Sequence, residues 1–372
     1  MTRISAAWGR LGLVQRIVAL VIPLALIVAA GGAAVYVLAS GPGPIAVINN
    51  PSPAPTATPP PPLPPEPTLE PDVSPSPTPT PAPPGADPLL GTDGRLTVLL
   101  LGSDYRPAHP GNRTDAIMVV SVDPTTGKAA GFSVPRDTSG FPLVNGTKYG
   151  AKVNALYQQL QSTTGNGGLA LSDAVGKAFN IEIDGYVFIG FEGVKNLVGA
   201  VGGVDITLDK PYYDAHYWVT ARHEGWGLPA GRSHLDAKDA LIFARSRKGD
   251  NDFGRARRQQ QLVIAALAKV RTLGVAKLPR LLQIASQTVR TNLPLARSSD
   301  LFDIVAKTDI SKIQRVVFGP TTYASGAGGT SFELKLSVCR NWIRSHFPPI
   351  RPMGQWPAVS TPSPSSAASP SP

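Results

Sequence analysis

Hydrophobic positions form one long uninterrupted run near the N-terminus and a series of short segments after residue 95. The long run covers residues 17–38, holds no charged residue, and exceeds the roughly 20 helical residues that cross the hydrocarbon of a bilayer. The short segments change between the spacing of strands and the spacing of helices. This pattern predicts a membrane-spanning helix followed, after a spacer, by a folded domain.

Short continuous apolar runs predict strands, and apolar residues three and four positions apart predict helices. The expected strands are residues 96–102, 116–122, 129–134, 185–189, 204–208 and 314–318. The expected helices are residues 152–161, 172–180, 193–201, 237–247, 255–273, 278–289 and 299–307, with Ser172 as the N-cap of the second. A turn signal at residues 124–127 favours an antiparallel pair between the second and third strands. Because the strands and helices interleave without a regular repeat, we expect an α/β domain: a central mixed β-sheet with helices on both faces.

The charges that flank the long apolar run predict its orientation. Arg3, Arg10 and Arg16 precede the run, and no charge follows it before Glu66. Positive flanks stay in the cytoplasm, so residues 1–16 are expected inside and the folded domain outside the cell membrane. A cleaved signal peptide is the alternative, but its apolar region is typically only about 7 to 15 residues. We therefore expect residues 17–39 to be a single-pass transmembrane anchor.

Composition divides the remainder of the chain. The residues after the anchor are mostly Pro, Ser, Thr and Ala, which cannot bury enough apolar surface to fold and which favour extended conformations. Residues 40–94 are therefore expected to be a disordered linker, and residues 351–372 a disordered tail. The globular pattern begins at residue 95. The lone Cys339 excludes an internal disulfide.

The predicted folded part is strongly basic. The net charge is +10, and removing the +3 of the first 16 residues and the −5 of the linker leaves +12. A basic surplus indicates nucleic acid, anionic lipid headgroups or phosphate-bearing substrates. Outside a membrane the last two are favoured, and the sequence shows no recognised DNA-binding module, so we expect no nucleic-acid partner.

Two carboxylates stand where predicted strands meet loops. Asp104, in GSDYR, follows the first strand, and Asp115, in NRTD, precedes the second. Two carboxylates in one site repel each other unless a cation or a proton lies between them. Mg²⁺ usually takes one or two carboxylates together with substrate phosphates. The pair is therefore either a magnesium site or two ordinary capping aspartates, and spacing alone favours the second interpretation.

Arginines gather in two later clusters. Arg136 follows the third strand, where its guanidinium is suited either to a phosphate or to a surface salt bridge. Arg255, Arg258 and Gln259 form one row of a predicted helix that continues into its apolar stripe. Because buried charges need partners, arginines on this core-facing row imply a bound polyanion, and Arg245 follows the same logic on the preceding helix. A solvated basic helix is the alternative.

In this order, the clusters resemble the LytR-CpsA-Psr family of envelope proteins. The likeness runs from about residue 96 to residue 320, and its motifs are LLLGSDYR, GNRTDAIMVVSVDP, GFSVPRD, KVNALY, AVGGVDITL, LPAG and FARSRKGDNDFGRARRQQ. The resemblance implies a phosphotransferase of cell-wall assembly, with residues 95–320 as its catalytic domain. Such an enzyme moves a glycopolymer from a polyprenyl diphosphate carrier to peptidoglycan. Residues 321–350 lie outside the likeness and are expected to be a C-terminal extension.

The resemblance also implies roles for individual residues. The metal ligands fall on Asp104 and Asp115, with Mg²⁺ as the metal and Mn²⁺ as the alternative. The diphosphate-binding residues fall on Arg106, Arg113, Arg136, Arg245, Arg247, Arg255, Arg258 and Gln259. The expected catalytic set is Asp104, Asp115, Arg136, Arg245, Asp252 and Arg255. A tunnel for the polyprenyl tail is expected to be lined by Val187, Ile189, Leu197, Val198, Leu262 and Leu267, which fit a plain core equally well.

Two other functions fit the same residues. With water in place of the wall hydroxyl, the protein is a polyprenyl diphosphate pyrophosphatase that acts on lipid-linked glycans. Without chemistry, it is a lipid-linked glycan-binding or regulatory protein of the envelope. Glycan joined to peptidoglycan, rather than free glycan phosphate, separates transfer from hydrolysis. If the protein only binds lipid-linked glycans, it should keep its function when Asp104 and Asp115 are replaced by neutral residues.

Overall fold

The computed structural model describes residues 89–105, 112–273, 278–294, 297–326 and 331–350 of the chain. The segments predicted as cytoplasmic N-terminus, anchor and tail, most of the predicted linker, and Arg106 lie outside the described residues. The helices of the described ranges lack the combination of length and apolar character that crossing a membrane requires.

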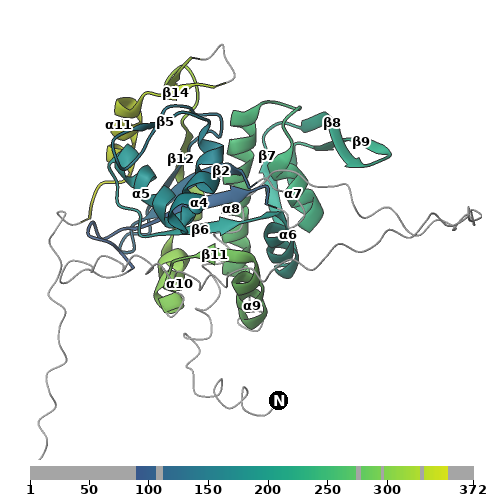
Figure 1. Cartoon of the computed structure of the whole chain (residues 1–372). Helices are drawn as coiled ribbons and strands as arrows, with labels where there is room; N and C mark the ends of the chain where they lie inside the picture. The colour runs from purple at the N-terminus through teal and green to yellow at the C-terminus, as the bar shows by residue number, and fades with distance from the viewer. Residues whose placement is uncertain (1–88, 106–111, 274–277, 295–296, 327–330, 351–372) are drawn as a thin grey trace, which may run out of the picture.

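A six-stranded mixed sheet forms the centre of the fold (Figure 1). Its strand order is β11 (Val289–Thr291), β6 (Gly185–Ile189), β1 (Leu96–Ser103), β2 (Thr114–Val122), β3 (Ala129–Ser133) and β12 (Gln314–Val317). β2 is antiparallel to both β1 and β3, and β6 is antiparallel to β11. β6 runs parallel to β1, and β12 runs parallel to β3. The predicted mixed sheet and the predicted antiparallel pair are both confirmed.

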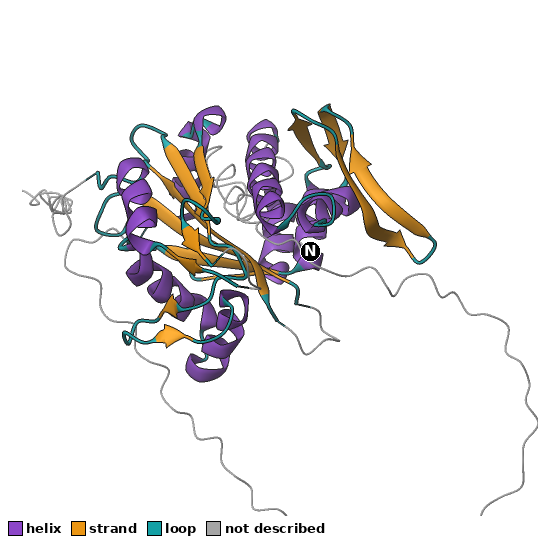
Figure 2. Ribbon diagram, turned by 90° about the horizontal axis from the view of Figure 1, so that it is seen from above, coloured by secondary structure: helices purple, strands orange, loops and turns teal. Residues whose placement is uncertain are grey.

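Helices cover both faces of the sheet, as predicted (Figure 2). One face carries α6 (Phe191–Ala200), α7 (Ala237–Arg245), α8 (Asp252–Thr272), α9 (Leu278–Thr288) and α10 (Ser298–Lys307). The other face carries α4 (Leu156–Thr164), α5 (Gly167–Phe179) and α11 (Leu336–His346). Along β1, Leu100 packs on the first face, whereas Leu99 and Leu101 pack on the second. A strand buried on both sides has an unbroken apolar sequence, which explains the run that predicted β1.

The first turn of α5 differs from the prediction. The helix begins at Gly167 rather than at Ser172, and its N-cap is Asn166, whose side chain accepts a hydrogen bond from the backbone N of Leu169 at 3.1 Å. Gly168 lies against the ring of Tyr186, where an added Cβ would be 2.2 Å from a ring carbon. Close packing therefore explains why a glycine stands in this turn, and Ser172 lies inside the helix.

The folded part extends beyond both predicted boundaries. Leu89 is buried, and Thr92 donates hydrogen bonds from its N and Oγ1 to Glu182 Oε2, both at 2.6 Å. At the other end, Cys339 of α11 is buried in the core of the second face of the sheet. Residues 89–94 are thus structured, and the segment predicted as a C-terminal extension completes one face of the domain.

Short elements surround the central sheet. They are the 3-10 turns η2 (Val153–Ala155) and η5 (Ile310–Lys312), and the paired strands β4 (Phe141–Pro142) and β5 (Lys148–Tyr149), β7 (Val204–Leu208) and β10 (Gly231–Leu235), β8 (Tyr212–Thr220) and β9 (His223–Leu228), and β13 (Ala324–Ser325) and β14 (Glu333–Leu334). The β8–β9 hairpin projects from the body of the domain (Figures 1 and 2). No strand was predicted there, because the segment lacks the apolar runs of the central strands.

A buried carboxyl next to β6 predicts a pH-dependent stability. The Oδ2 of Asp184 accepts a hydrogen bond from the backbone N of Thr97 at 2.6 Å, whereas its Oδ1 has no hydrogen-bond partner in the described structure. Burial raises the pKa of Asp184 well above its ordinary value of 3.8, and the charges of Asp93 and Glu182 act in the same direction. The folded protein therefore holds this proton more tightly than the unfolded chain. Protonation of Asp184 therefore contributes to the free energy of unfolding. This contribution is fully present below the ordinary pKa and is lost as pH rises through the raised pKa.

Asp184→Asn removes this ionisation while keeping an oxygen acceptor for Thr97. We expect the variant to melt at a higher temperature than the wild type at pH 7.5, because the neutral amide avoids a buried negative charge. The difference should shrink as pH falls toward 4, where the wild-type carboxyl is protonated. Scanning calorimetry at both pH values tests this expectation, and a difference independent of pH would contradict it.

Candidate active site

A β-bulge between β1 and β2 changes the direction of one predicted carboxylate. Gly102 pairs with Ala116 and Ser103 pairs with Thr114, so Asp115 is the extra residue of β2. A bulge of this kind redirects a side chain out of the regular alternation. The bulge thus places Asp115 at the end of the sheet where β1 continues into its loop.

Asp104 lies in that loop. Its Oδ1 accepts a hydrogen bond from the backbone N of Arg113 at 2.7 Å, and its own backbone N donates to the carbonyl of Arg113 at 3.0 Å. These two hydrogen bonds fix Asp104 against the start of β2. Asp104 and Asp115 both line one cavity.

The cavity has a volume of about 370 Å³, which is within the range of small-ligand sites. Its walls come from the β1–β2 end, the segment after β3, the hairpin strand β8, and the facing ends of α7 and α8. The lining residues are Asp104, Arg113, Asp115, Arg136, Asp214, His216, Tyr217, Arg245, Arg247, Lys248 and Arg255. Five arginines and one lysine face three aspartates, so the cavity has an excess of positive charge.

Arg136 links two carboxylates in the cavity wall. Its Nη1 lies 3.1 Å from Asp115 Oδ1, and its Nε lies 3.2 Å from Asp252 Oδ2. Burial lowers the pKa of Arg136, but the charges of Asp115, Asp252 and the neighbouring Asp137 outweigh that effect and raise it. The side chain is 20% exposed, so Arg136 is a largely enclosed cation rather than half of a surface salt bridge.

Asp252 organises the arginines at the start of α8. It is the first residue of the helix, and the preceding N-cap Asn251 accepts hydrogen bonds from the backbone N of two residues of the first turn. Asp252 Oδ1 lies 3.4 Å from Arg255 Nη1 and 3.8 Å from Arg247 Nη1. Asp252 is not among the residues that line the cavity, and it acts by positioning those that do.

Arg255 is the most deeply enclosed cation of the cavity wall. It is 3% exposed, and its Nε has no hydrogen-bond partner in the described structure. Burial lowers the pKa of Arg255 to about 10, and the charges of Arg136 and Arg247 act in the same direction. The carboxylates of Asp252 and Asp115 oppose that fall. The two carboxylates only partly offset the lost hydration of this buried guanidinium. A bound anion would offset the rest, so the site is suited to an anion.

Arg245 is held by aromatic rings at the end of α7. Its guanidinium carbon lies 5.1 Å from the centroid of Phe191 and 5.7 Å from that of Tyr217. Both distances are within the range of favourable cation–π contacts. Burial raises the pKa of Tyr217, and the charge of Arg245 partly opposes that rise. Arg245 therefore enters the cavity with its side chain oriented by two rings.

Asp214 of β8 is buried and was not among the predicted site residues. Its Oδ2 accepts hydrogen bonds from Ser246 Oγ, from the backbone N of Arg247 at 3.0 Å and from that of Lys248 at 2.9 Å. Burial raises the pKa of Asp214, but these hydrogen bonds outweigh it and lower the pKa. Asp214 thus fixes the loop after α7 against β8. The available signal was an aspartate inside the aromatic stretch YYDAHYW.

Arg258 contacts the end of α7 and the loop that follows it. Its Nε donates to the carbonyl of Phe243 at 3.0 Å, and its other two nitrogens contact the Ser246 carbonyl and the Asp250 carboxylate. The guanidinium also lies 4.0 Å from the centroid of the Tyr212 ring. Arg258 is not among the lining residues of the cavity. Its guanidinium donates hydrogen bonds to carbonyls at the end of α7.

Gln259 also contacts the end of α7. Its side-chain nitrogen donates to the carbonyl of Ala244 at 3.2 Å, and the residue does not line the cavity. Like Arg258, it meets the last turn of α7. On the core-facing row of α8, both residues therefore link α8 to the last turn of α7.

Arg258→Met is therefore expected to destabilise the fold. The substitution removes the donor from two buried carbonyls and the cation from Asp250, which should lower the free energy of unfolding by about 3 kcal/mol. The exposed Arg257, one residue earlier on the same helix, provides the control, since Arg257→Met should change stability by less than about 0.5 kcal/mol. Urea unfolding of both variants tests the assignment, and equal stabilities would contradict it.

Comparison with known proteins identifies the family. The sequence profile described as the LytR_cpsA_psr family matches residues 76–332. The chain belongs to the LytR-CpsA-Psr family. The match extends past residue 320, and so includes part of the segment predicted to lie outside the likeness.

Two curated relatives and one solved structure show the degree of similarity. Polyisoprenyl-teichoic acid–peptidoglycan teichoic acid transferase TagV of Bacillus subtilis (strain 168) is 30% identical over 259 residues, which cover 67% of this chain and 64% of TagV. TagU of Bacillus cereus (strain AH820), which carries the same transferase name, is 34% identical over 178 residues, covering 47% of this chain and 52% of TagU. The chain thus spans between about half and two thirds of these relatives. The crystal structure of B. subtilis TagV aligns with a TM-score of 0.54 and 28% identity, covering 68% of this chain and 96% of that one.

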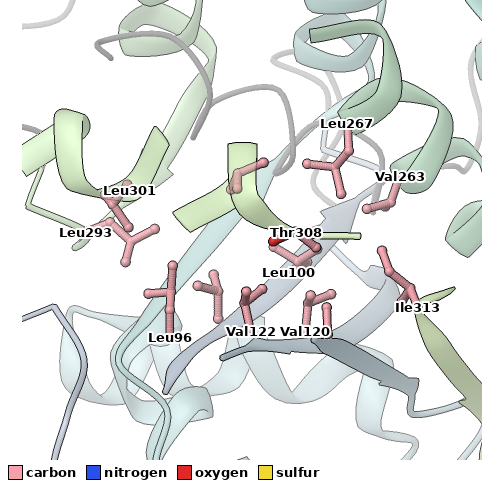
Figure 3. A pocket seen from close by; sticks show the side chains of 13 residues that line it. Leu96, Leu100, Val120, Val122, Val263, Leu267, Leu293, Leu301, Thr308 and Ile313 are labelled. Carbon is pink, nitrogen blue, oxygen red and sulfur yellow. The ribbon is translucent and has the colours of Figure 1, made fainter. Parts of the chain in front are cut away.

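In this LytR-CpsA-Psr domain, a second and apolar cavity of about 60 Å³ lies between the sheet and helices α8 and α10 (Figure 3). Its lining residues are Leu96, Val98, Leu100, Val120, Val122, Ala129, Val263, Leu267, Leu293, Leu301, Val305, Thr308 and Ile313. Of the six residues expected in a lipid tunnel, only Leu267 lines it. The other five are buried in the core, in line with the plain-core alternative: Val187, Ile189, Leu197, Val198 and Leu262.

The carboxylates of the larger cavity suit a magnesium ion. Among the described residues, no group of three or more His, Cys, Asp or Glu side chains is arranged to hold a metal. Mg²⁺ does not require such a group, because it usually binds one or two carboxylates and completes its shell with water and substrate phosphates. Asp104 and Asp115 supply this donor set, and Mn²⁺ accepts the same oxygen ligands.

Proposed function

We propose that the protein is a phosphotransferase that moves a glycopolymer from a polyprenyl diphosphate carrier to peptidoglycan. The observation that carries the proposal is the cavity in which five arginines and one lysine surround Asp104 and Asp115. A diphosphate is densely negative, and its transfer depends mainly on positioning and neutralising that charge. The names of the two curated relatives, which specify teichoic acid transfer to peptidoglycan, favour an anionic wall polymer as the transferred group.

The proposed reaction uses the cavity residues in a defined way. An acceptor hydroxyl oxygen attacks the phosphorus that carries the glycan, the bond from that phosphorus to the bridging oxygen breaks, and polyprenyl phosphate leaves with the electron pair. Arg245, Arg247 and Arg255 bind and neutralise the diphosphate oxygens. Arg136, held by two aspartates, keeps this wall in position. The hydroxyl proton must be accepted by a base at the acceptor side.

We also propose that Asp104 and Asp115 hold Mg²⁺, or Mn²⁺ as the alternative. A bound divalent cation would neutralise charge on the diphosphate oxygens and favour departure of polyprenyl phosphate. The bulge at Asp115 supports this assignment, because it directs a second carboxylate into the cavity that Asp104 already lines. Arg136 then holds Asp115 in place from the side of the protein.

A single-pass membrane topology is part of the proposal. The apolar run at residues 17–38 and the three preceding arginines support an anchor with a cytoplasmic N-terminus and an extracytoplasmic domain. The proline-rich residues that follow, at about 3.1 Å each when extended, give a reach on the order of 150 Å. Such a reach suits an enzyme that takes its donor from the membrane and its acceptor from the wall.

Incubation of the purified protein with a polyprenyl diphosphate-linked glycan, Mg²⁺ and peptidoglycan fragments tests the function. Mass spectrometry should detect glycan phosphate joined to the fragment, together with polyprenyl phosphate. Free glycan phosphate as the sole product would instead identify a pyrophosphatase. Unchanged donor that remains bound to the protein would identify a binding protein.

A further inference from the structure

The hairpin strand β8 supplies one wall of the arginine-rich cavity. His216 and Tyr217 line the cavity from this strand, together with residues from the end of α7 and its following loop. The imidazole of a histidine is a neutral base near physiological pH, whereas arginine and lysine side chains are cations there. Among the described residues that line the cavity, His216 is the histidine.

The carboxylates of the same cavity already have partners. Asp115 pairs with Arg136, and Asp214 accepts several hydrogen bonds from the backbone around it. Asp104 Oδ1 accepts a hydrogen bond from the backbone N of Arg113. The hydrogen bonds to Asp214 lower the pKa of its carboxyl, and Asp104 and Asp115 are the proposed metal ligands. Among the described lining residues, this leaves the imidazole of His216 to accept a hydroxyl proton.

A carboxylate on the partner strand orients this imidazole. His216 Nδ1 lies 3.3 Å from Glu224 Oε1. With the hydrogen on Nδ1 donated to this carboxylate, Nε2 has the lone pair that can accept a proton. The side chain of His216 is 71% exposed and that of Glu224 is 39% exposed, which gives a proton on the imidazole a direct route to water.

Asp214 ties the position of His216 to that of the cationic wall. Its Oδ1 accepts a hydrogen bond from the backbone N of His216 at 3.1 Å, while its Oδ2 holds the backbone of Arg247 and Lys248. The register of the hairpin is irregular between Asp214 and Trp218, which brackets His216. One buried side chain thus sets the distance between a base and the cations that would hold a diphosphate.

We propose that His216, oriented by Glu224, is the general base that activates the acceptor hydroxyl, an inference that rests on the proposed phosphotransfer. As the hydroxyl oxygen bonds to phosphorus, its proton passes to His216 Nε2, and polyprenyl phosphate leaves with the electron pair of the broken bond. The resulting imidazolium is stabilised by the Glu224 carboxylate and returns the proton to water. Positioned bases of this kind typically contribute about 10² to 10⁴ in rate.

The test uses the full chain with a geranylgeranyl diphosphate-linked disaccharide as donor and a soluble peptidoglycan fragment as acceptor. His216→Ala should lower kcat for transfer by about 100-fold or more, while donor affinity, measured by calorimetry without acceptor, stays within about twofold. Added imidazole should raise the rate of this variant by at least about tenfold, because it occupies the vacated space and supplies the same lone pair. Glu224→Gln should lower kcat by about tenfold without changing the KM for the acceptor.

His223→Ala is the matched control, since His223 is exposed on the same hairpin and does not line the cavity. It should keep wild-type activity. Wild-type transfer in His216→Ala, or a loss that imidazole does not restore, would overturn the assignment of His216 as the base. Absence of joined product from the wild-type protein would overturn the phosphotransferase proposal itself, so the two failures are distinguishable.

Discussion

Arg255→Met is expected to lower phosphotransfer by about one to two orders of magnitude or more, without lowering the stability of the fold. Each charge-assisted hydrogen bond from the guanidinium to a diphosphate is worth roughly 1.5 to 3 kcal/mol, and methionine makes none. Stability should be unchanged or higher, because burial already lowers the pKa of Arg255 to about 10 and an apolar side chain removes that desolvation cost. Asp252 retains Arg136 and Arg247 as partners.

Two further variants sharpen this test. Arg255→Lys should restore activity only partly, because a point charge does not reproduce the bidentate fork of a guanidinium. Arg257→Met, on the exposed face of α8, should leave both activity and melting temperature unchanged. A large fall in the melting temperature of Arg255→Met with diphosphate binding intact would show that Arg255 is a structural ion-pair partner and would contradict the diphosphate clamp.

Asp115→Asn is expected to lower turnover by about 100-fold or more and to weaken its dependence on Mg²⁺. The amide keeps an oxygen that can accept a hydrogen bond from Arg136, but it lacks the negative charge that a divalent cation requires. The fold should survive, since the residue stands in a bulge rather than in the regular ladder. Titration of activity with MgCl₂ measures the effect directly.

The control for the metal is the exposed Asp303 of α10, whose replacement by Asn should change neither turnover nor the Mg²⁺ titration. EDTA should abolish wild-type activity, and excess Mg²⁺ should restore it. Wild-type turnover that persists in EDTA would show that Asp104 and Asp115 do not hold a metal that the reaction requires.

The central strands and helices were predictable because burial dictates their sequence patterns. β1 is buried on both faces and therefore has an unbroken apolar sequence, while α8 shows the apolar stripe that packs on the sheet. The β8–β9 hairpin has neither pattern, because Tyr213 and Trp218 are exposed on it and its pairing is irregular. His216 and Asp214 were missed for the same reason.

The different positions of Arg255 and Arg258 in the fold could not be predicted from the sequence. They stand three residues apart on one helix face, and their sequence context predicts the same polyanion for both. In the fold, Arg258 meets the carbonyls at the end of α7, whereas Arg255 meets the cavity. The difference depends on how α7 packs against α8, which no periodicity within α8 encodes. The six residues for which lipid tunnel and plain core both stayed open show the same ambiguity, because a core position and a cavity position are equally apolar.

The most direct test of the phosphotransferase account follows the oxygen atoms of the product in H₂¹⁸O. The reaction contains a polyprenyl diphosphate-linked glycan, Mg²⁺ and a peptidoglycan fragment. We expect the fragment to gain glycan phosphate and to contain no ¹⁸O. In that reaction, the oxygen that attacks phosphorus comes from the fragment's own hydroxyl. Glycan phosphate released free and carrying one ¹⁸O would mean that water is the acceptor, and would contradict transfer to the wall.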